Sequence, residues 1–187
     1  MITIDKEKKV HGRQLEITTY GHENDAVVVE GRLTDNRHRE TYYFSSGESR
    51  PPGIVHDMII RIVVRGPELV IDDIDVDMLT VPRKECLEVK NSLKPVIGMK
   101  IKSGFTERVK AKVGGAKGCT HLVALLLTMA PAAVQGAFSA VAQQPVDTEK
   151  YSGTAMKFLE NTCWVWRSDG ELIKETRDIL SSGKRHD

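Results

Sequence analysis

A run of apolar residues from 122 to 142 most constrains how this chain can fold, because it has no charged side chain and could span a bilayer. Such a segment is stable only inside a membrane or inside a protein core. Much of the run is alanine, and Pro131, Gln135, Gly136 and Ser139 interrupt it. Aromatic belts and a clear charge asymmetry at its ends are absent. The run therefore predicts a buried helix and no membrane span.

Four segments in the first half of the chain are typical of β-strands: residues 15–20, 26–33, 54–65 and 69–79. Turns are expected between the two members of each pair, at residues 21–25 and 66–68. In the last segment Asp73, Asp75 and Asp77 alternate with apolar residues, which predicts a half-buried strand with a carboxylate-rich outer face. The polar residues 36–52 predict a loop, with a short strand over 41–44 as an alternative.

The second half of the chain predicts helices. Apolar residues recur at helical spacing over residues 86–97, where Pro95 should break the last turn. Residues 106–113 predict a short basic helix. The apolar helix should begin near Thr120 and kink or split at Pro131.

Residues 154–166 predict a last helix, with a strand as the alternative over residues 163–166, and Cys163 is expected to pack in the core. Strands followed by helices indicate an α+β fold, with an antiparallel sheet and C-terminal helices packed on it. The length of 187 residues predicts one domain, 1–187, mainly β over 1–82 and mainly α over 83–187.

The overall composition excludes several classes of protein. The net charge is +1, and neither zinc-finger spacing nor an aromatic-rich basic strand is present, so we expect no nucleic-acid partner. Three cysteines are too few, and odd in number, for a disulfide framework. The polar first residues lack the apolar core of a signal peptide, so a reducing cytoplasm is expected.

Cys119 and His121 open the apolar run, directly after a glycine-rich segment at 114–118. Residues two apart inside a helix point to nearly opposite sides. The glycines place Cys119 at or before the first turn, with Thr120 as a suitable N-cap, so both side chains can point the same way. The free N–H groups of a helix start also favour a thiolate. The pair is a candidate metal or reactive site, with a buried thiol and a core histidine as the alternative.

Two other segments supply candidate ligands. His56 and Asp57 interrupt an apolar strand, and because neighbours on a strand face opposite sides, one of them points toward the core. The alternative for Asp57 is a strand-end cap or a pair with an arginine such as Arg61. Cys86 lies near a predicted helix start among basic residues, which again favours a thiolate, with a buried helix residue as the alternative.

The basic segment 100–117 ends in glycines before a helix, where Lys117 and Gly118 could bind the phosphate of a small anionic ligand or cofactor. No Walker pattern is present and no strand precedes the segment. A solvated basic face is the alternative interpretation.

The order of several motifs resembles known families. GRLTD (31–35), HDM (56–58) and GCTHL (118–122), followed by a late cysteine before an Arg-x-Asp-Gly turn, resemble a bacterial family known only as a domain of unknown function, over nearly the whole chain. The chain is also distantly similar to the iron–sulfur cluster assembly scaffold of the NifU amino-terminal type. That family has an antiparallel sheet with helices packed on it and holds a cluster or zinc at one end.

The scaffold resemblance implies a ligand for each segment. Asp57 matches the scaffold's aspartate, Cys86 lies close to its second cysteine, and Cys119 and His121 fall near its His-Cys pair. The order Cys-x-His reverses that pair, and Cys86 lies a few residues late. Together with His56 these residues form a mixed sulfur, nitrogen and oxygen set suited to zinc or iron.

Three functions remain open from the sequence. The first is a soluble metal-binding protein that holds zinc or iron at one end of the sheet. The second is an enzyme that uses a metal, or Cys119 as nucleophile with His121 or His56 as base, on an anionic small molecule such as an acyl-coenzyme A or aromatic acid. The third is a structural module whose apolar run is partly a homo-oligomer interface.

Overall fold

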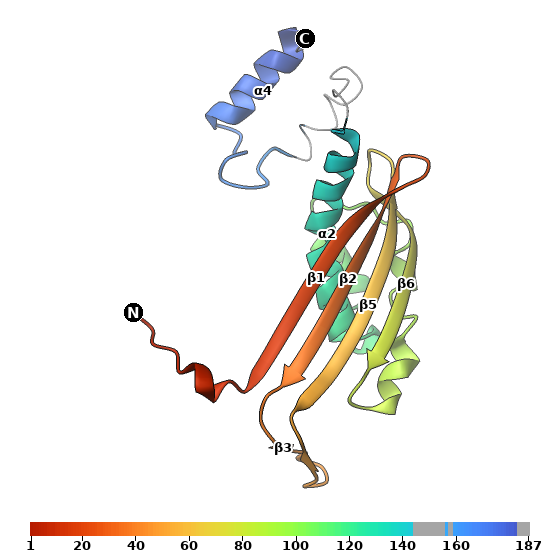
Figure 1. Ribbon diagram of the computed structural model, residues 1–187. Helices are drawn as coiled ribbons and strands as arrows, with labels where there is room; N and C mark the ends of the chain where they lie inside the picture. The colour runs from red at the N-terminus through yellow and green to blue at the C-terminus, as the bar shows by residue number, and fades with distance from the viewer. Residues whose placement is uncertain (144–155, 157–158, 183–187) are drawn as a thin grey trace.

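The computed structural model describes residues 1–143, 156 and 159–182, and its main body is an antiparallel sheet of four long strands (Figure 1). The strands pair in the order β1-β2-β5-β6. Their bounds are His11–His22 for β1, Ala26–Arg37 for β2, Gly53–Arg65 for β5 and Val70–Thr80 for β6. The helices follow in the second half of the chain, so the predicted α+β class is confirmed.

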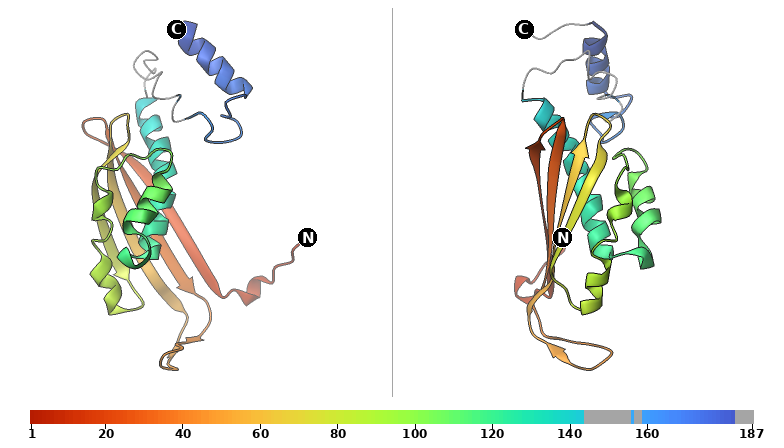
Figure 2. Two further views of the ribbon diagram at one scale, coloured as in Figure 1. Left: turned by 180° about the vertical axis from the view of Figure 1, so that it is seen from behind. Right: turned by 90° about the vertical axis from the view of Figure 1, so that its right-hand side faces the viewer.

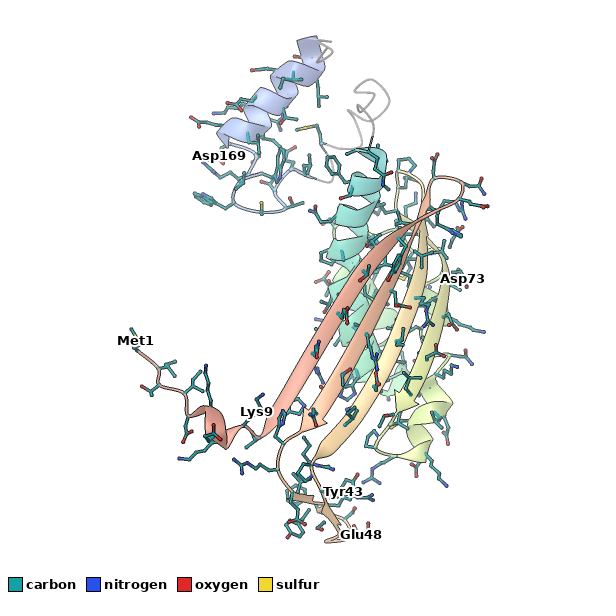
Figure 3. All side chains as sticks on the ribbon, viewed as in Figure 1. Met1, Lys9, Tyr43, Glu48, Asp73 and Asp169 are labelled. Atoms are coloured by element: carbon teal, nitrogen blue, oxygen red, sulfur yellow. The ribbon has the colours of Figure 1, made fainter. Side chains whose placement is uncertain are left out.

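Tight turns join the outer strand pairs as the sequence predicts. Between β1 and β2 the turn residues Asn24 and Asp25 adopt positive φ of 57° and 55°, which asparagine and aspartate tolerate better than most residues. Between β2 and β5 the chain leaves the sheet and forms a small hairpin, β3 (Thr41–Tyr42) and β4 (Ser49–Arg50), at one end of the molecule (Figure 3). The alternative short strand over 41–44 is therefore present in part.

Alternation along the strands gives the sheet one apolar and one polar face. On β5 the even-numbered residues from Met58 to Val64 are buried, whereas the odd-numbered Arg61 forms ion pairs with Glu30 and Asp77 on the other face. The predicted carboxylate-rich outer face of β6 is present. Within the described residues, the helices that touch the sheet lie on its apolar face (Figure 2).

The apolar run forms helix α2 (Thr120–Val141), which contacts β1, β2 and β5. The helix continues through Pro131 as one element, so the predicted split is wrong, and a kink at this residue stays a prediction. Gly31 of β2 permits the close approach, because a Cβ there would lie 2.7 Å from Met129 Sδ. By length and composition α2 could also cross a membrane, and 39% of its most apolar window is buried in the structure.

The predicted helix over residues 86–97 is wrong. This segment contains two short 3-10 helices, η2 (Lys84–Val89) and η3 (Lys94–Val96). Pro95 lacks an N–H and crowds the carbonyl four residues before it, which disfavours an α-helix at this point, although the longer and more apolar α2 tolerates Pro131. Helix α1 (Phe105–Val113) confirms the predicted basic helix, and the 3-10 turn η4 (Gly115–Lys117) follows it. Another 3-10 turn, η1 (Lys6–Lys8), precedes β1 at the start of the chain.

Of the predicted helix over residues 154–166, positions 154, 155, 157 and 158 lie outside the described residues, while 156 and 159 are helical, so the helix does not extend to residue 166. Residues 160–166 form turns and bends, so the alternative strand over 163–166 is wrong. Cys163 is exposed, which corrects its predicted place in the core. Helix α4 (Glu171–Ser182) was not predicted, although Leu172, Ile173 and Ile179 recur at helical spacing.

Candidate metal centre

Three elements bring Asp35, His56 and His121 to one place at the end of the sheet. Asp35 lies near the end of β2 and is the register partner of His56, near the start of β5. His121 lies in the first turn of α2. One potential ligand atom from each residue lies within 4.8 Å of those from the other two. Two strands and a helix start therefore converge on a nitrogen- and oxygen-donor cluster.

The imidazoles of the two histidines surround one carboxylate oxygen. His56 Nδ1 lies 3.0 Å from Asp35 Oδ2, and His121 Nε2 lies 3.6 Å from the same oxygen. The two rings stack with centroids 3.8 Å apart. Only 3% of the Asp35 side chain is exposed. A carboxylate so deeply buried must be paired, hydrogen-bonded or bound to a cation.

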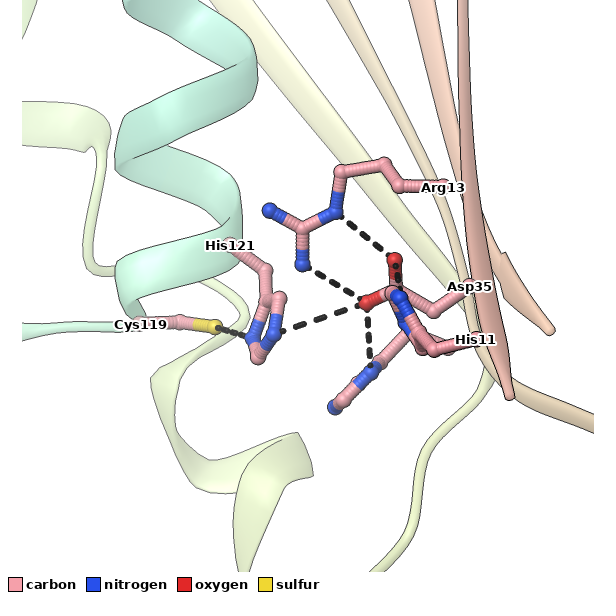
Figure 4. Close-up of polar contacts among 6 residues, drawn as sticks. His11, Arg13, Asp35, Cys119 and His121 are labelled. Carbon is pink, nitrogen blue, oxygen red and sulfur yellow. Dashed lines mark hydrogen bonds and ion pairs between the residues drawn. The ribbon is translucent and has the colours of Figure 1, made fainter. Parts of the chain in front are cut away.

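Strand β1 supplies two further side chains to Asp35 (Figure 4). Arg13, its register partner on β1, donates from Nε to Oδ1 at 2.7 Å and from Nη2 to Oδ2 at 2.8 Å. His11 Nε2 lies 3.5 Å from Oδ1. The hydrogen bond from Arg13, more than any other cause, holds the pKa of Asp35 below its usual range, so the carboxylate is ionised at neutral pH.

Cys119 is the N-cap residue of α2 and lies beside His121. Its Sγ is 3.7 Å from His121 Nδ1, so the cap position does let both side chains point the same way, as expected. Thr120, predicted as the cap, is the first helical residue instead. Burial, then the charges of His56 and Arg13, lower the pKa of His121, whereas Asp35 opposes the shift. The imidazole is therefore neutral at pH 7 and has a free lone pair.

Asp57 and Cys86 lie outside the Asp35, His56 and His121 cluster. Asp57 follows His56 on β5 and points to the opposite face of the sheet, where Arg32 donates to both of its oxygens at 2.8 and 2.6 Å. An arginine pair was the expected alternative, although with Arg61 instead of Arg32. Cys86 is half-buried on η2. Of the five expected ligands the structure brings His56 and His121 together, with Cys119 beside His121, and their role as metal ligands stays a prediction.

Lys117 and Gly118 each have structural partners within the chain. Lys117 Nζ donates to the Ala111 carbonyl at 2.7 Å, near the end of α1, where cations favour the free carbonyls. A Cβ at Gly118 would lie 2.8 Å from Val113 O and 2.9 Å from Ser92 Oγ. Close packing thus accounts for the glycine, and phosphate binding at this pair stays a prediction.

Asp35 and Arg13 were missed as site residues, although the sequence carries a signal for the aspartate. Val27, Val29 and Leu33 alternate on the buried face of β2, and Asp35 continues the same odd-numbered series. A carboxylate in a buried series is costly and therefore informative. The same alternation places His56, but not Asp57, on the face of β5 that the helices cover.

A family model described as a protein of unknown function (DUF2889) matches residues 11–135, a range that begins with β1 and ends inside α2. The match contains all six residues of Figure 4. No curated protein and no solved structure shows a match. The expected likeness to a domain of unknown function is confirmed, and the distant scaffold resemblance stays a prediction.

Proposed function

The chain belongs to the DUF2889 family of proteins of unknown function, and we propose that it binds a divalent transition metal, zinc or iron, through Asp35, His56 and His121. The observation that carries the proposal is the convergence of their ligand atoms within 4.8 Å of one another. Two imidazoles and one carboxylate are ligands that both ions accept.

The separations fit a single ion. Ligands at about 2.1 Å from a tetrahedral ion lie about 3.4 Å apart, and an octahedral ion brings adjacent ligands to about 3.0 Å. The distances of 3.0 and 3.6 Å from Asp35 Oδ2 to the two histidines span these values. The third separation, between the two histidine nitrogens, is at most 4.8 Å, so an ion would draw the ligand side chains closer together.

Arg13 and Cys119 support the ligands in this proposal. Histidine ligands usually donate their second ring nitrogen to a partner, which fixes the tautomer, and metal-bound carboxylates are hydrogen-bonded in turn. His121 faces Asp35 with Nε2 and Cys119 with Nδ1. Arg13 fixes the orientation of the carboxylate. Cys119 thus acts beside a ligand and not as one.

Three protein ligands leave at least one coordination position open, which is typical of catalytic zinc and of two-histidine-one-carboxylate iron centres. Closed structural zinc sites have four protein ligands instead. The proposal therefore favours a centre that accepts water or a further ligand at the metal.

Metal titration of neighbouring variants tests the proposal. Metal-free protein is titrated with zinc(II), and with iron(II) under anaerobic conditions, by calorimetry, and metal content is measured after dialysis. His56→Ala should weaken binding at least about 100-fold, because it removes a direct ligand. Asp57→Asn is the matched control, since it changes the adjacent residue on the opposite face of β5.

Two results together support these three residues as the ligands. The wild type binds one ion per chain, and Asp57→Asn binds it with the same affinity. His121→Gln provides a second ligand variant if His56→Ala folds poorly. Equal affinity in the wild type and both histidine variants contradicts the proposal, as does a wild type that retains no metal.

A thiolate enzyme is the second candidate, because Cys119, His121 and Asp35 also form a chain of contacts. Cys119 Sγ lies 3.7 Å from His121 Nδ1, and His121 Nε2 lies 3.6 Å from Asp35 Oδ2. This order matches a nucleophile, a base and a carboxylate that orients the base. The contact to sulfur is within hydrogen-bond length, and the one to Asp35 is slightly longer, as is common before substrate binds. A metal bound to His121 Nε2 would occupy the lone pair that the base needs, so the two candidate functions exclude each other.

Alkylation of Cys119 separates the two candidates. The thiolate proposal expects Cys119 to react at pH 7 faster than the exposed Cys163 of the same chain, and more slowly in His121→Gln. A rate no faster than that of Cys163 counts against a nucleophile.

A further inference from the structure

The candidate metal centre is more open toward β1 than toward α2 and β5. The side chains of Asp35, His56 and His121 are 3%, 13% and 22% exposed. Arg13 and His11 are 38% and 53% exposed. Because β1 is an edge strand of the sheet, a molecule from solvent would reach the centre past these two cationic or titratable side chains.

The charge of the metal-loaded centre favours an anionic ligand. Among the six residues drawn in Figure 4, Asp35 alone carries a negative charge, and Arg13 already neutralises it. The two positive charges of a divalent ion would therefore stay uncompensated at a largely buried position. Buried charge is costly unless it is paired, so an anion at the open coordination position would stabilise the loaded centre.

One N–H group of Arg13, at Nη1, could donate a hydrogen bond to such an anion. Its Nε and Nη2 donate to Asp35, and no hydrogen bond from Nη1 is found within the part of the chain that the structure describes. A guanidinium matches the planar geometry of carboxylates and the oxygens of phosphates better than an ammonium does. One arginine can therefore orient Asp35 and bind a second oxyanion.

We propose that the metal-loaded centre binds a small molecule through an oxyanionic group, a carboxylate or a phosphate, held between the open coordination position and Arg13 Nη1. The proposal rests on the metal binding proposed above and adds a ligand class and a specificity residue to it. His11 lines the same approach from β1, 3.5 Å from Asp35 Oδ1.

The test uses the full chain loaded with cobalt(II), which takes the same nitrogen and oxygen ligands and has visible absorption that responds to its coordination. Acetate and inorganic phosphate are titrated separately at constant ionic strength. Arg13→Gln should weaken oxyanion binding about 10- to 100-fold, the value of one charge-assisted hydrogen bond. Arg32→Gln is the matched control, because Arg32 pairs with Asp57 on the opposite face.

Cobalt content is measured for each variant, so that a loss of metal is distinguished from a loss of anion. Arg13→Lys keeps the charge without the planar fork and should fall between the wild type and Arg13→Gln. A response to acetate alone or to phosphate alone supports the proposal and identifies the group.

Two results overturn the proposal while leaving metal binding intact. One is a cobalt-loaded wild type whose absorption responds to neither anion, and the other is equal oxyanion affinity in the wild type and Arg13→Gln. Failure to bind any metal contradicts the proposed function itself and removes the premise of this inference.

Discussion

Replacement of Gly136 by alanine tests how closely α2 lies on the sheet. A Cβ at this position would lie 2.5 Å from Thr19 Cβ and 2.2 Å from Thr19 Cγ2. Because the Cβ of Thr19 is fixed to the backbone of β1, no change of rotamer relieves the first contact. Carbon atoms in contact prefer about 3.5–4.0 Å. The helix must therefore move about 1 Å away from β1.

The expected loss of stability follows from two opposed effects. Alanine in place of glycine inside a helix gains about 1 kcal/mol of helix propensity. Overpacking of a close contact costs about 1–3 kcal/mol, and here it also opens the neighbouring contacts of α2. We expect a net loss of about 1–2 kcal/mol in the free energy of unfolding, or a fall in Tm of about 2–8 °C for a chain of this size.

Urea and thermal unfolding, followed by circular dichroism, measure this loss. Ser139→Ala is the matched control, because Ser139 is exposed three residues later on the same helix, where only propensity changes. Thr19→Gly removes the opposing atoms and should restore part of the stability of Gly136→Ala. Unchanged or increased stability in Gly136→Ala would refute the close approach of α2 to β1.

Zinc at 100 times its Kd should raise the free energy of unfolding of the wild type by about 2.7 kcal/mol, measured as a rise in Tm. The same zinc concentration should leave the Tm of His121→Ala nearly unchanged. The hydrogen bond from Arg32 lowers the pKa of Asp57 in the fold, so the stability that Asp57 adds over Asp57→Asn is full at neutral pH. It should fall as the pH drops below about 4, and a difference that stays constant between pH 7 and 3 in urea unfolding argues against this pair. Brief alkylation followed by mass spectrometry should label the exposed Cys163 before the half-buried Cys86, and the reverse order would contradict their placement.

The sheet could be predicted because apolar and polar side chains alternate along each strand, a pattern that is local to the segment. Alternation along residues 54–65 and 69–79 gives both the strands and the face that each residue occupies. The segment 86–97 shows the opposite case, since its apolar spacing fits a helix while Pro95 disfavours one, and two short 3-10 helices form instead. Here a single backbone constraint outweighs the side-chain pattern.

The candidate site could be predicted only in part, because its residues meet through long-range pairing. The cap geometry of Cys119 and His121 is local and follows from the glycines before them. The register that places Asp35 opposite His56 joins strands across a 15-residue excursion, and no local pattern fixes it. Asp57 was expected as a ligand, but it is an odd-numbered residue of β5, and the even-numbered residues face α2. Its side chain therefore points to the opposite face of the sheet, toward Arg32.

Asp35 and Asp57 provide a comparison built into the sheet. Both are buried aspartates, and each receives two hydrogen bonds from one arginine of a neighbouring strand. A bidentate arginine pair therefore accounts for a buried carboxylate without a metal, and by itself it argues for stability alone. What distinguishes Asp35 is the pair of histidines whose nitrogens lie at metal-ligand separations from the same oxygen. Asp35→Asn and Asp57→Asn should thus both lower stability, while only the change at Asp35 should abolish metal binding.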